Sequence, residues 1–196
     1  MALLTDDDRL VLLKLARSVI TSELLGNKSI VVNPKDISPA MRQKSGCFVT
    51  LHKEGSLRGC IGTIEPTTSL LSCVEANAIN AAFRDPRFSP LSGKELDEID
   101  IEISVLTAPR MLNFKDGDDL KNQLVAGVHG VILSQGYRRA TFLPQVWMQL
   151  PQKEDFLEHL CLKGCMTPSA WKDPQTRVEV YEVEYFSEKQ ILHKHS

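Results

Sequence analysis

The chain has 196 residues, of which 42% are hydrophobic and 24% charged, a composition typical of a globular domain with a substantial core. A formal net charge of −2 gives no general attraction to nucleic acid or anionic membranes, so neither is expected as a partner. No apolar run approaches the roughly 20 residues of a membrane-spanning helix, and the acidic N-terminus does not resemble a signal peptide.

The first predicted element is a helix that begins after Thr5 and ends at Gly26. Thr5 can cap it, aspartates follow in the first turn, where they complement the helix dipole, and an apolar stripe runs along one face. Residues 27–46 contain two prolines and several polar residues, which predicts a connecting loop. Residues 47–53 are strand-like, and a turn at 54–56 leads into a second strand.

The rest of the chain mixes helices and strands. A second helix is predicted from residues 66–68 to Asp85-Pro86, because proline cannot continue a helix. The later predicted elements are a strand at 100–107, a helix at 116–126, a hairpin at 128–142 turning near Gln135-Gly136, a helix at 154–163 and a strand at 178–186. Without a regular βαβ repeat, this order favours an α+β fold with a mixed or antiparallel sheet and flanking helices.

The segment LRGCIGT at residues 57–63 carries the strongest chemical signal. Cys60 stands between Gly59 and Gly62, whose bare backbones allow close approach and offer amide donors, and Arg58 would share its face on a regular strand. An arginine beside a thiol stabilises the thiolate, so Cys60 is a candidate nucleophile. Alternatively, the glycines allow tight packing, Arg58 pairs with an acid, and Cys60 is an inert buried thiol.

Four further segments accompany LRGCIGT in a fixed order: FRDPRFSPLSGKEL at 83–96, IEISVLTAP at 101–109, GVHGVIL at 127–133 and ATFLPQVW at 140–147. Together they resemble the AMMECR domain family, whose microbial members are called AmmeMemoRadiSam system protein A. The resemblance implies one domain over residues 1–196, or two intertwined subdomains, forming two closely packed lobes with a groove between them. It also implies an association with Memo-like and radical-SAM proteins of the same pathway, and it implies no settled reaction.

Other residues are weaker candidates. His129, between Gly127 and Gly130, could act as a base near neutral pH, a role that the resemblance to GVHG supports, or it could be a turn residue. Gln145 stands where many family members carry a glutamate, which weakens any role that needs a carboxylate there.

A polar set near the end of the second helix, including Arg84 and Arg87, could hold an anion or form a salt-bridged helix terminus. Glu102 is either a functional carboxylate or a solvated strand position.

Cysteine usage indicates a reducing compartment. The five cysteines are odd in number and scattered, so reduced thiols in a cytoplasmic protein are expected; they are Cys47, Cys60, Cys73, Cys161 and Cys165. Cys161 and Cys165 lack the further ligands of a zinc site, so no metal is expected. No phosphate loop, dinucleotide fingerprint or other cofactor motif occurs, which leaves the cofactor unknown.

These features predict an enzyme that uses Cys60 on a small anionic molecule, with Arg58 and His129 assisting. The alternative is a non-catalytic binding or scaffold module that holds a partner protein. Nucleic-acid binding is a third and weaker interpretation, because only the Arg138-Arg139 pair beside Tyr137 supports it.

Overall fold

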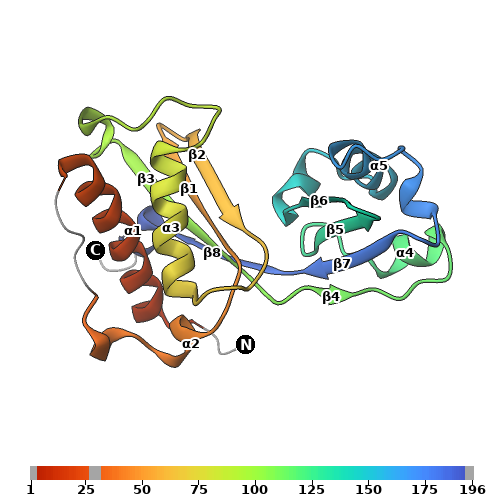
Figure 1. Cartoon of the computed structure of the whole chain (residues 1–196), viewed down its shortest axis with the longest axis horizontal. Helices are drawn as coiled ribbons and strands as arrows, with labels where there is room; N and C mark the ends of the chain where they lie inside the picture. The colour runs from red at the N-terminus through yellow and green to blue at the C-terminus, as the bar shows by residue number, and fades with distance from the viewer. Residues whose placement is uncertain (1–3, 27–31, 193–196) are drawn as a thin grey trace. The chain divides into compact units, whose positions relative to one another are not determined.

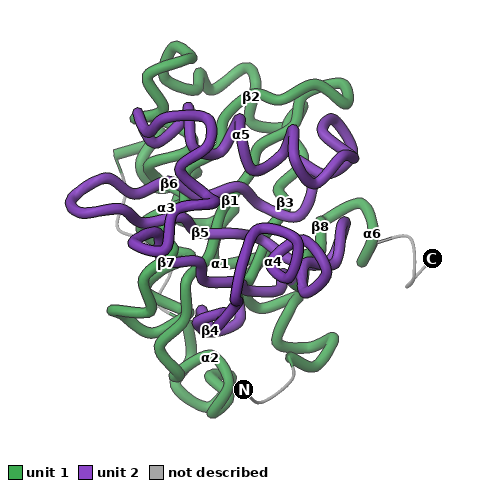
Figure 2. Tube along the Cα trace, turned by 90° about the vertical axis from the view of Figure 1, so that its right-hand side faces the viewer, with its two compact units in different colours: residues 1–106, 184–196 green, residues 107–183 purple. Residues whose placement is uncertain are grey.

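The computed structural model describes residues 4–26 and 32–192 and divides into two compact units. Unit 1 comprises residues 1–106 and 184–196, and unit 2 comprises residues 107–183 (Figure 2). Each unit has its own four-stranded sheet and its own hydrophobic core. The chain therefore has the predicted α+β fold, while the lobe packing and the groove implied by the family resemblance stay predictions.

Two helices cover one face of the unit 1 sheet (Figure 1). Helix α1 (Asp6–Leu25) begins with a capping box in which Thr5 and Asp8 exchange hydrogen bonds, and it ends at Gly26 with a φ of 64°, as predicted. Helix α3 (Leu70–Phe83) packs against α1 and the sheet. The strand order is β2-β1-β3-β8, with bounds Ser56–Thr63, Cys47–Lys53, Ile99–Leu106 and Val183–Ser187.

Strands β1 and β2 form the predicted hairpin. Glu54 and Gly55 both have positive φ, of 51° and 79°, which suits a two-residue hairpin turn because its backbone twist matches that of the strands. The register pairs Leu51 with Gly59 but His52 with Leu57, so Arg58 is the extra residue of a β-bulge. The pairing of the two strands is thus irregular at Arg58 and regular again from Gly59 onward.

Two predictions for unit 1 are corrected. Helix α3 begins at Leu70, because Ser69 rather than residues 66–68 caps it and accepts the Ser72 amide. The predicted loop contains two short helices, a 3₁₀ turn at Pro34–Asp36 and α2 at Pro39–Arg42, each with proline at its first position. The predicted loop residues 27–31 lie outside the described part of the chain.

Unit 2 is built around the sheet β4-β7-β5-β6. Its strands are Arg110–Met111, Arg177–Tyr181, Gly130–Gln135 and Arg138–Phe142, in that order, and its helices are α4 (Gly117–Gln123) and α5 (Lys153–Lys163). The hairpin β5–β6 turns at Gly136, whose φ is 61°, as predicted. Trp147 stacks on Phe156 in the core, with ring centroids 3.6 Å apart.

The predicted final strand at 178–186 is two strands that belong to different sheets. Strand β7 pairs within unit 2, and β8 pairs within unit 1. The chain changes sheet at Glu182, whose amide donates to Thr107 Oγ1 and whose carbonyl accepts the Thr107 amide. The pattern of apolar residues continues through this change of pairing partner. The sequence therefore predicts one strand where the structure has two.

Candidate functional site

The candidate site lies on the face of the unit 1 sheet that points away from α1 and α3. Successive strand residues alternate between faces, and the buried residues Cys47, Val49 and Leu51 of β1 occupy the helix-covered face. Thr50 therefore lies on the opposite face, where it pairs with Cys60 of β2. On its other side, Thr50 pairs with Glu102 of β3. These three side chains, here called the cross-strand row, lie next to one another across three strands.

Within the cross-strand row, the thiol and the carboxyl are both partly buried. Thr50 Oγ1 donates a hydrogen bond to Cys60 Sγ over 3.3 Å. Burial raises the pKa of the Glu102 carboxyl, the charge of Asp100 adds to this effect, and the charge of His52 opposes it. Glu102 can thus hold a proton at a higher pH than an exposed glutamate, as a general acid requires.

An ion pair closes the open edge of β2 at Cys60. Asp85 Oδ2 accepts the Cys60 amide over 2.8 Å, and Arg87 Nη2 donates to the Cys60 carbonyl over 3.1 Å. The side chain of Asp85, which is 1% exposed, also binds Arg87 through both carboxylate oxygens, at 2.7 and 2.9 Å. This pair satisfies the backbone groups that an edge strand leaves open, and it fixes the position of Cys60.

In the Asp85–Arg87 pair, each residue stabilises the charged form of the other. Hydrogen bonds from Arg87 are the largest cause that holds the pKa of Asp85 well below its usual range, and the Cys60 amide contributes to it. Hydrogen bonding to Asp85 is the largest cause that raises the pKa of Arg87, and a Cys60 thiolate would add to it through its charge. The cation nearest to the thiol along these contacts is therefore Arg87.

Arg58 makes its contacts elsewhere. Its guanidinium donates to Glu95 over 2.9 and 3.2 Å and to the Ser89 carbonyl over 3.0 Å. The bonds from Arg58 are the main cause that lowers the pKa of Glu95 to about 2. This is the salt-bridged arrangement that the sequence left open as the alternative for Arg58. The bulge removes the regular alternation on which its predicted place beside Cys60 depended.

Gly59 and Gly62 are close-packing positions. A side chain at Gly59 would overlap the carbonyl of Ala81 in α3, and one at Gly62 would overlap the ring of Phe48 on β1. Neither glycine has the positive φ that would explain it by backbone conformation. The nearest amide donor, that of Cys60, is bound to Asp85. The structure gives both glycines a packing role, and their ligand-binding role stays a prediction.

His129 belongs to unit 2 and is 5% exposed. Its Nδ1 accepts the Val125 amide over 3.1 Å, and its carbonyl accepts Trp147 Nε1 over 2.7 Å. Burial lowers the pKa of His129, nearby Arg110 lowers it further, and Glu182 opposes both. A neutral ring that accepts at Nδ1 carries its proton on Nε2, so its basic lone pair is already in use. These contacts match a turn residue, and the role of base toward Cys60 stays a prediction.

The other predicted ligand residues differ in their surroundings. Arg84 ends α3 and donates to Asn80 over 3.2 Å at the surface, an ordinary helix-terminus contact. Gln145 lies in the 3₁₀ helix Pro144–Met148 of unit 2, and its Oε1 is buried without a hydrogen-bond partner among the residues that the structure describes. Arg84 and Gln145 make no hydrogen bond or ion pair with the cross-strand row in the described part of the chain.

The sequence does not point to Thr50, and it places Asp85 in the polar set near the end of the second helix, which could hold an anion or form a salt-bridged helix terminus. Thr50 can be found once the pairing of β1, β2 and β3 is known, because it is the residue opposite both Cys60 and Glu102. Within residues 4–26 and 32–192, no group of three or more metal-ligating side chains comes together. In the same ranges, no helix is long and apolar enough to cross a bilayer.

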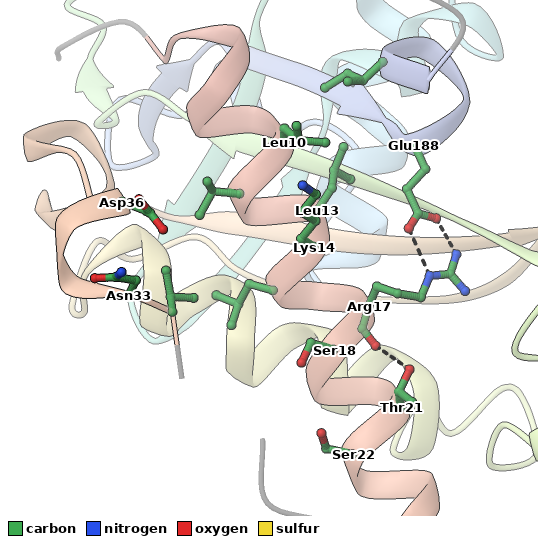
Figure 3. A pocket seen from close by; sticks show the side chains of 14 residues that line it. Leu10, Leu13, Lys14, Arg17, Ser18, Thr21, Ser22, Asn33, Asp36 and Glu188 are labelled. Carbon is green, nitrogen blue, oxygen red and sulfur yellow. Dashed lines mark hydrogen bonds and ion pairs between the residues drawn. The ribbon is translucent and has the colours of Figure 1, made fainter. Parts of the chain in front are cut away.

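A cavity of about 700 Å³ lies along α1 in unit 1 (Figure 3). Its wall is mainly apolar, and the ion pair between Arg17 and Glu188 stands at its edge. Hydroxyl groups of Ser18, Thr21 and Ser22 also line it. Among the described residues, none of the cross-strand row lines this cavity. Its mainly apolar wall suits the binding of an apolar group.

Comparison with known proteins gives consistent matches along the chain. A family model described as AMMECR1 matches residues 13–186. A protein from Methanothermobacter thermautotrophicus is 40% identical over 186 residues, which cover 94% of this chain and 96% of that protein. A protein from Methanosarcina acetivorans is 38% identical, with 96% and 95% covered. The crystal structure of protein PH0010 from Pyrococcus horikoshii superposes with a TM-score of 0.82 at 34% identity, covering 92% of this chain and 91% of that one.

Proposed function

This chain belongs to the AMMECR1 family, and we propose that it is a small-molecule enzyme whose nucleophile is Cys60. The observation that carries the proposal is the cross-strand row, in which a partly exposed thiol, a hydroxyl that donates to it and a carboxyl of raised pKa share one sheet face. Active sites are where such groups gather.

Thr50 and Arg87 support the nucleophile. The Thr50 hydroxyl and the nearby Arg87 guanidinium are both placed to stabilise the negative charge of a thiolate nucleophile. In an acyl transfer, this thiolate attacks a carbonyl carbon of the substrate, an S–C bond forms, and the bond to the leaving group breaks. The product of this half-reaction is an acyl-enzyme at Cys60.

Glu102 supplies the proton transfers. Two strand spacings, about 10 Å, separate the backbones of β2 and β3, so a small substrate would lie over Thr50 to reach both the thiol and the carboxyl. The protonated carboxyl gives its proton to the leaving group, and the resulting carboxylate takes a proton from the water that cleaves the acyl-enzyme. One water is consumed, an acid and the leaving group are released, and Glu102 is protonated again.

Arg87 provides the contact for an anionic substrate. Its Nε and Nη2 bind Asp85 and the Cys60 carbonyl, whereas its Nη1 makes no hydrogen bond within the described residues. Its side chain is 54% exposed, so this free edge can bind a carboxylate or phosphate beside the thiol. The proposal includes a cytoplasmic location and a shared pathway with Memo-like and radical-SAM proteins, both of which rest on the resemblance to the family.

The test uses mono-p-nitrophenyl succinate, an activated ester with a free carboxylate. We expect a burst of p-nitrophenolate and a succinyl adduct on Cys60, located by mass spectrometry. The Cys60→Ser variant should lose both signals, and Glu102→Gln should keep the burst but slow the later turnover. Arg87→Gln and Arg84→Gln remove the same charge, but only Arg87 contacts Cys60. Comparing the two variants therefore separates the effect of the Arg87 contact on substrate binding from the effect of overall charge. A wild-type adduct that forms at Cys165 and not at Cys60 would contradict the proposal.

The second candidate function is a binding module, which the apolar cavity along α1 favours. Such a module would take up an apolar group, which can be detected with the fluorescent probe N-phenylnaphthylamine. Val11→Phe adds volume inside the cavity wall and should abolish the increase in fluorescence, whereas Val125→Phe at an exposed position of unit 2 should not. Unchanged probe binding in Val11→Phe would remove this candidate.

A further inference from the structure

Two buried thiols meet on the helix-covered face of the unit 1 sheet. Cys47 is the first residue of β1, and Cys73 lies in the first turn of α3. Their sulfur atoms are 2.9 Å apart, and the residues are 0% and 4% exposed. Cys60 lies on the opposite face of the same sheet, because Cys47 and Thr50 are an odd number of residues apart on β1. The pair is therefore separate from the cross-strand row.

Polar groups around the two sulfurs make them unequal. The Asn77 amide nitrogen donates to the Cys47 carbonyl over 3.1 Å and lies 3.4 Å from Cys73 Sγ and 3.6 Å from Cys47 Sγ. The hydrogen bond from Cys47 is the main cause that lowers the pKa of Cys73, with Thr63 and Asn77 assisting. The same bond raises the pKa of Cys47. When the pair loses one proton, Cys73 therefore carries the negative charge and Cys47 keeps its proton.

We propose that Cys47 and Cys73 form a modification site, at which hydrogen peroxide oxidises the two thiols to an intramolecular disulfide. A disulfide bond has a length of about 2.05 Å, so the sulfurs must approach each other by less than an ångström. Rotation of the two side chains can supply this movement. The product would join β1 to α3 across 26 positions of sequence.

The chemistry is a two-electron oxidation in two steps. The Cys73 thiolate attacks one peroxide oxygen, an S–O bond forms, the O–O bond breaks, and the hydroxide that leaves takes the proton of Cys47. The Cys47 thiolate then attacks the sulfenic sulfur, the S–S bond forms, and a second hydroxide leaves. This hydroxide takes from solvent the proton that Cys73 released when it ionised. Two thiols and one peroxide thus give one disulfide and two waters.

Burial decides which oxidants act on this pair. Cys73 is 4% exposed, so a molecule the size of peroxide can reach its sulfur during small openings of the fold, whereas a bulky disulfide cannot. Cys165 is exposed and Cys60 is partly exposed, and neither has another cysteine sulfur in contact among the described residues. Oxidation of Cys47 and Cys73 therefore gives an internal disulfide. Oxidation of Cys60 or Cys165 gives instead a sulfinic acid or a disulfide between chains.

The experiment treats the full chain with hydrogen peroxide, blocks the remaining thiols with N-ethylmaleimide in denaturant, and maps the non-reduced peptides by mass spectrometry. Chymotrypsin is needed, because the tryptic peptide at 59–84 contains both Cys60 and Cys73, whereas chymotrypsin cuts between them at Leu70 and Leu71. We expect a linked Cys47–Cys73 peptide that loses two hydrogens and that reductant separates. Oxidised glutathione should give more than ten-fold less of this peptide in the same time.

Two variants serve as controls. Cys60→Ser should keep the Cys47–Cys73 disulfide, and Cys73→Ala should lose it. The wild-type result alone decides the proposal, so a variant that fails to fold does not affect the test. If Cys47 and Cys73 both carry N-ethylmaleimide after Cys60 and Cys165 have been oxidised, the proposal is overturned. A link from Cys47 to Cys60 would overturn it equally, since those side chains point to opposite faces of the sheet.

Discussion

The strand that carries Cys60 in unit 1 and the strand that follows His129 in unit 2 share a local arrangement. Each contains a glycine whose missing side chain leaves room for an aromatic ring on the neighbouring strand. Phe48 occupies this space at Gly62, and Tyr181 occupies it at Gly130. Glycines beside a reactive residue type therefore indicate aromatic packing in both units, and they do not by themselves distinguish a site from a packing point.

What distinguishes the two regions is the state of the reactive side chain. The sulfur of Cys60 is partly exposed and receives a hydroxyl bond, while the Asp85–Arg87 pair holds its backbone. His129 is buried, and its ring nitrogen already accepts a backbone amide. In unit 1 the protein fixes the backbone and leaves the side chain available, whereas in unit 2 the side chain itself supports the fold.

The two glycines should differ most in their tolerance of alanine. Tyr181 is 1% exposed, and its hydroxyl bonds to Thr141 over 2.9 Å and to the Phe142 carbonyl over 3.2 Å, so its ring cannot move aside. Gly130→Ala should cost about 3 kcal/mol, whereas Gly62→Ala should cost about 1 kcal/mol because the partly exposed Phe48 can turn away.

Urea unfolding followed by far-ultraviolet circular dichroism measures both glycine variants. Tryptophan fluorescence reports only on unit 2, which contains both tryptophans, Trp147 and Trp171. Equal losses of stability in Gly130→Ala and Gly62→Ala would show that the rings of Tyr181 and Phe48 are equally fixed. This result would contradict the expected difference between the two glycines.

Removing the charge of Asp85 should have the next largest effect. Asp85→Asn keeps the shape but breaks the ion pair, and we expect a loss of about 2 kcal/mol, reduced from the value for a fully buried pair because Arg87 is half exposed. The folded-state pKa of Asp85 is depressed, so this stability is present above the ordinary carboxyl pKa and is lost as pH falls through the folded pKa. Thermal unfolding at neutral and strongly acidic pH should show the difference disappear in acid.

His129→Phe should lower stability without affecting the thiol. The variant leaves the Val125 amide without its acceptor, which should cost about 1.5 kcal/mol. Because the folded-state pKa of His129 is lowered, wild-type stability falls as pH drops from neutral through the folded pKa, and the variant should lose this dependence. A slower reaction of Cys60 in His129→Phe would restore the histidine as the base.

Glu102→Gln should have the smallest effect on stability and the opposite sign. The folded-state pKa of Glu102 is raised, so its favourable contribution is present at acidic pH and is lost as pH rises through that pKa. At neutral pH the free energy of unfolding of the variant should rise by up to about 1 kcal/mol, while turnover of the activated ester decreases. A loss of stability at neutral pH would contradict the assignment of Glu102 to a desolvated site.

The sequence predicted local features well, because caps, turns and breakers act over a few residues. Thr5, Gly26 and Gly136 mark element ends that the structure confirms. The division of 177–187 between two sheets was not predicted, since it depends on pairing partners far away in the chain.

The same difference holds for the candidate site. Cys60 stood out from its neighbours in the sequence, but Thr50 joins it only through the register of β1 and β2. The sequence predicts Arg58 beside the thiol, but one bulge residue changes how its side chain is directed, and the cation bonded to the Cys60 backbone is Arg87.

The most direct test of the account compares the alkylation of Cys60 and Cys165 by iodoacetamide across pH, read by mass spectrometry on the folded wild-type chain and on Thr50→Val. Cys165 is the more exposed cysteine, so access alone would favour it. We expect Cys60 to react at least about five-fold faster at neutral pH, because the Thr50 hydroxyl donates to its sulfur, and Thr50→Val to remove most of this advantage. A Cys60 that reacts more slowly than Cys165 at every pH would contradict its role as the nucleophile.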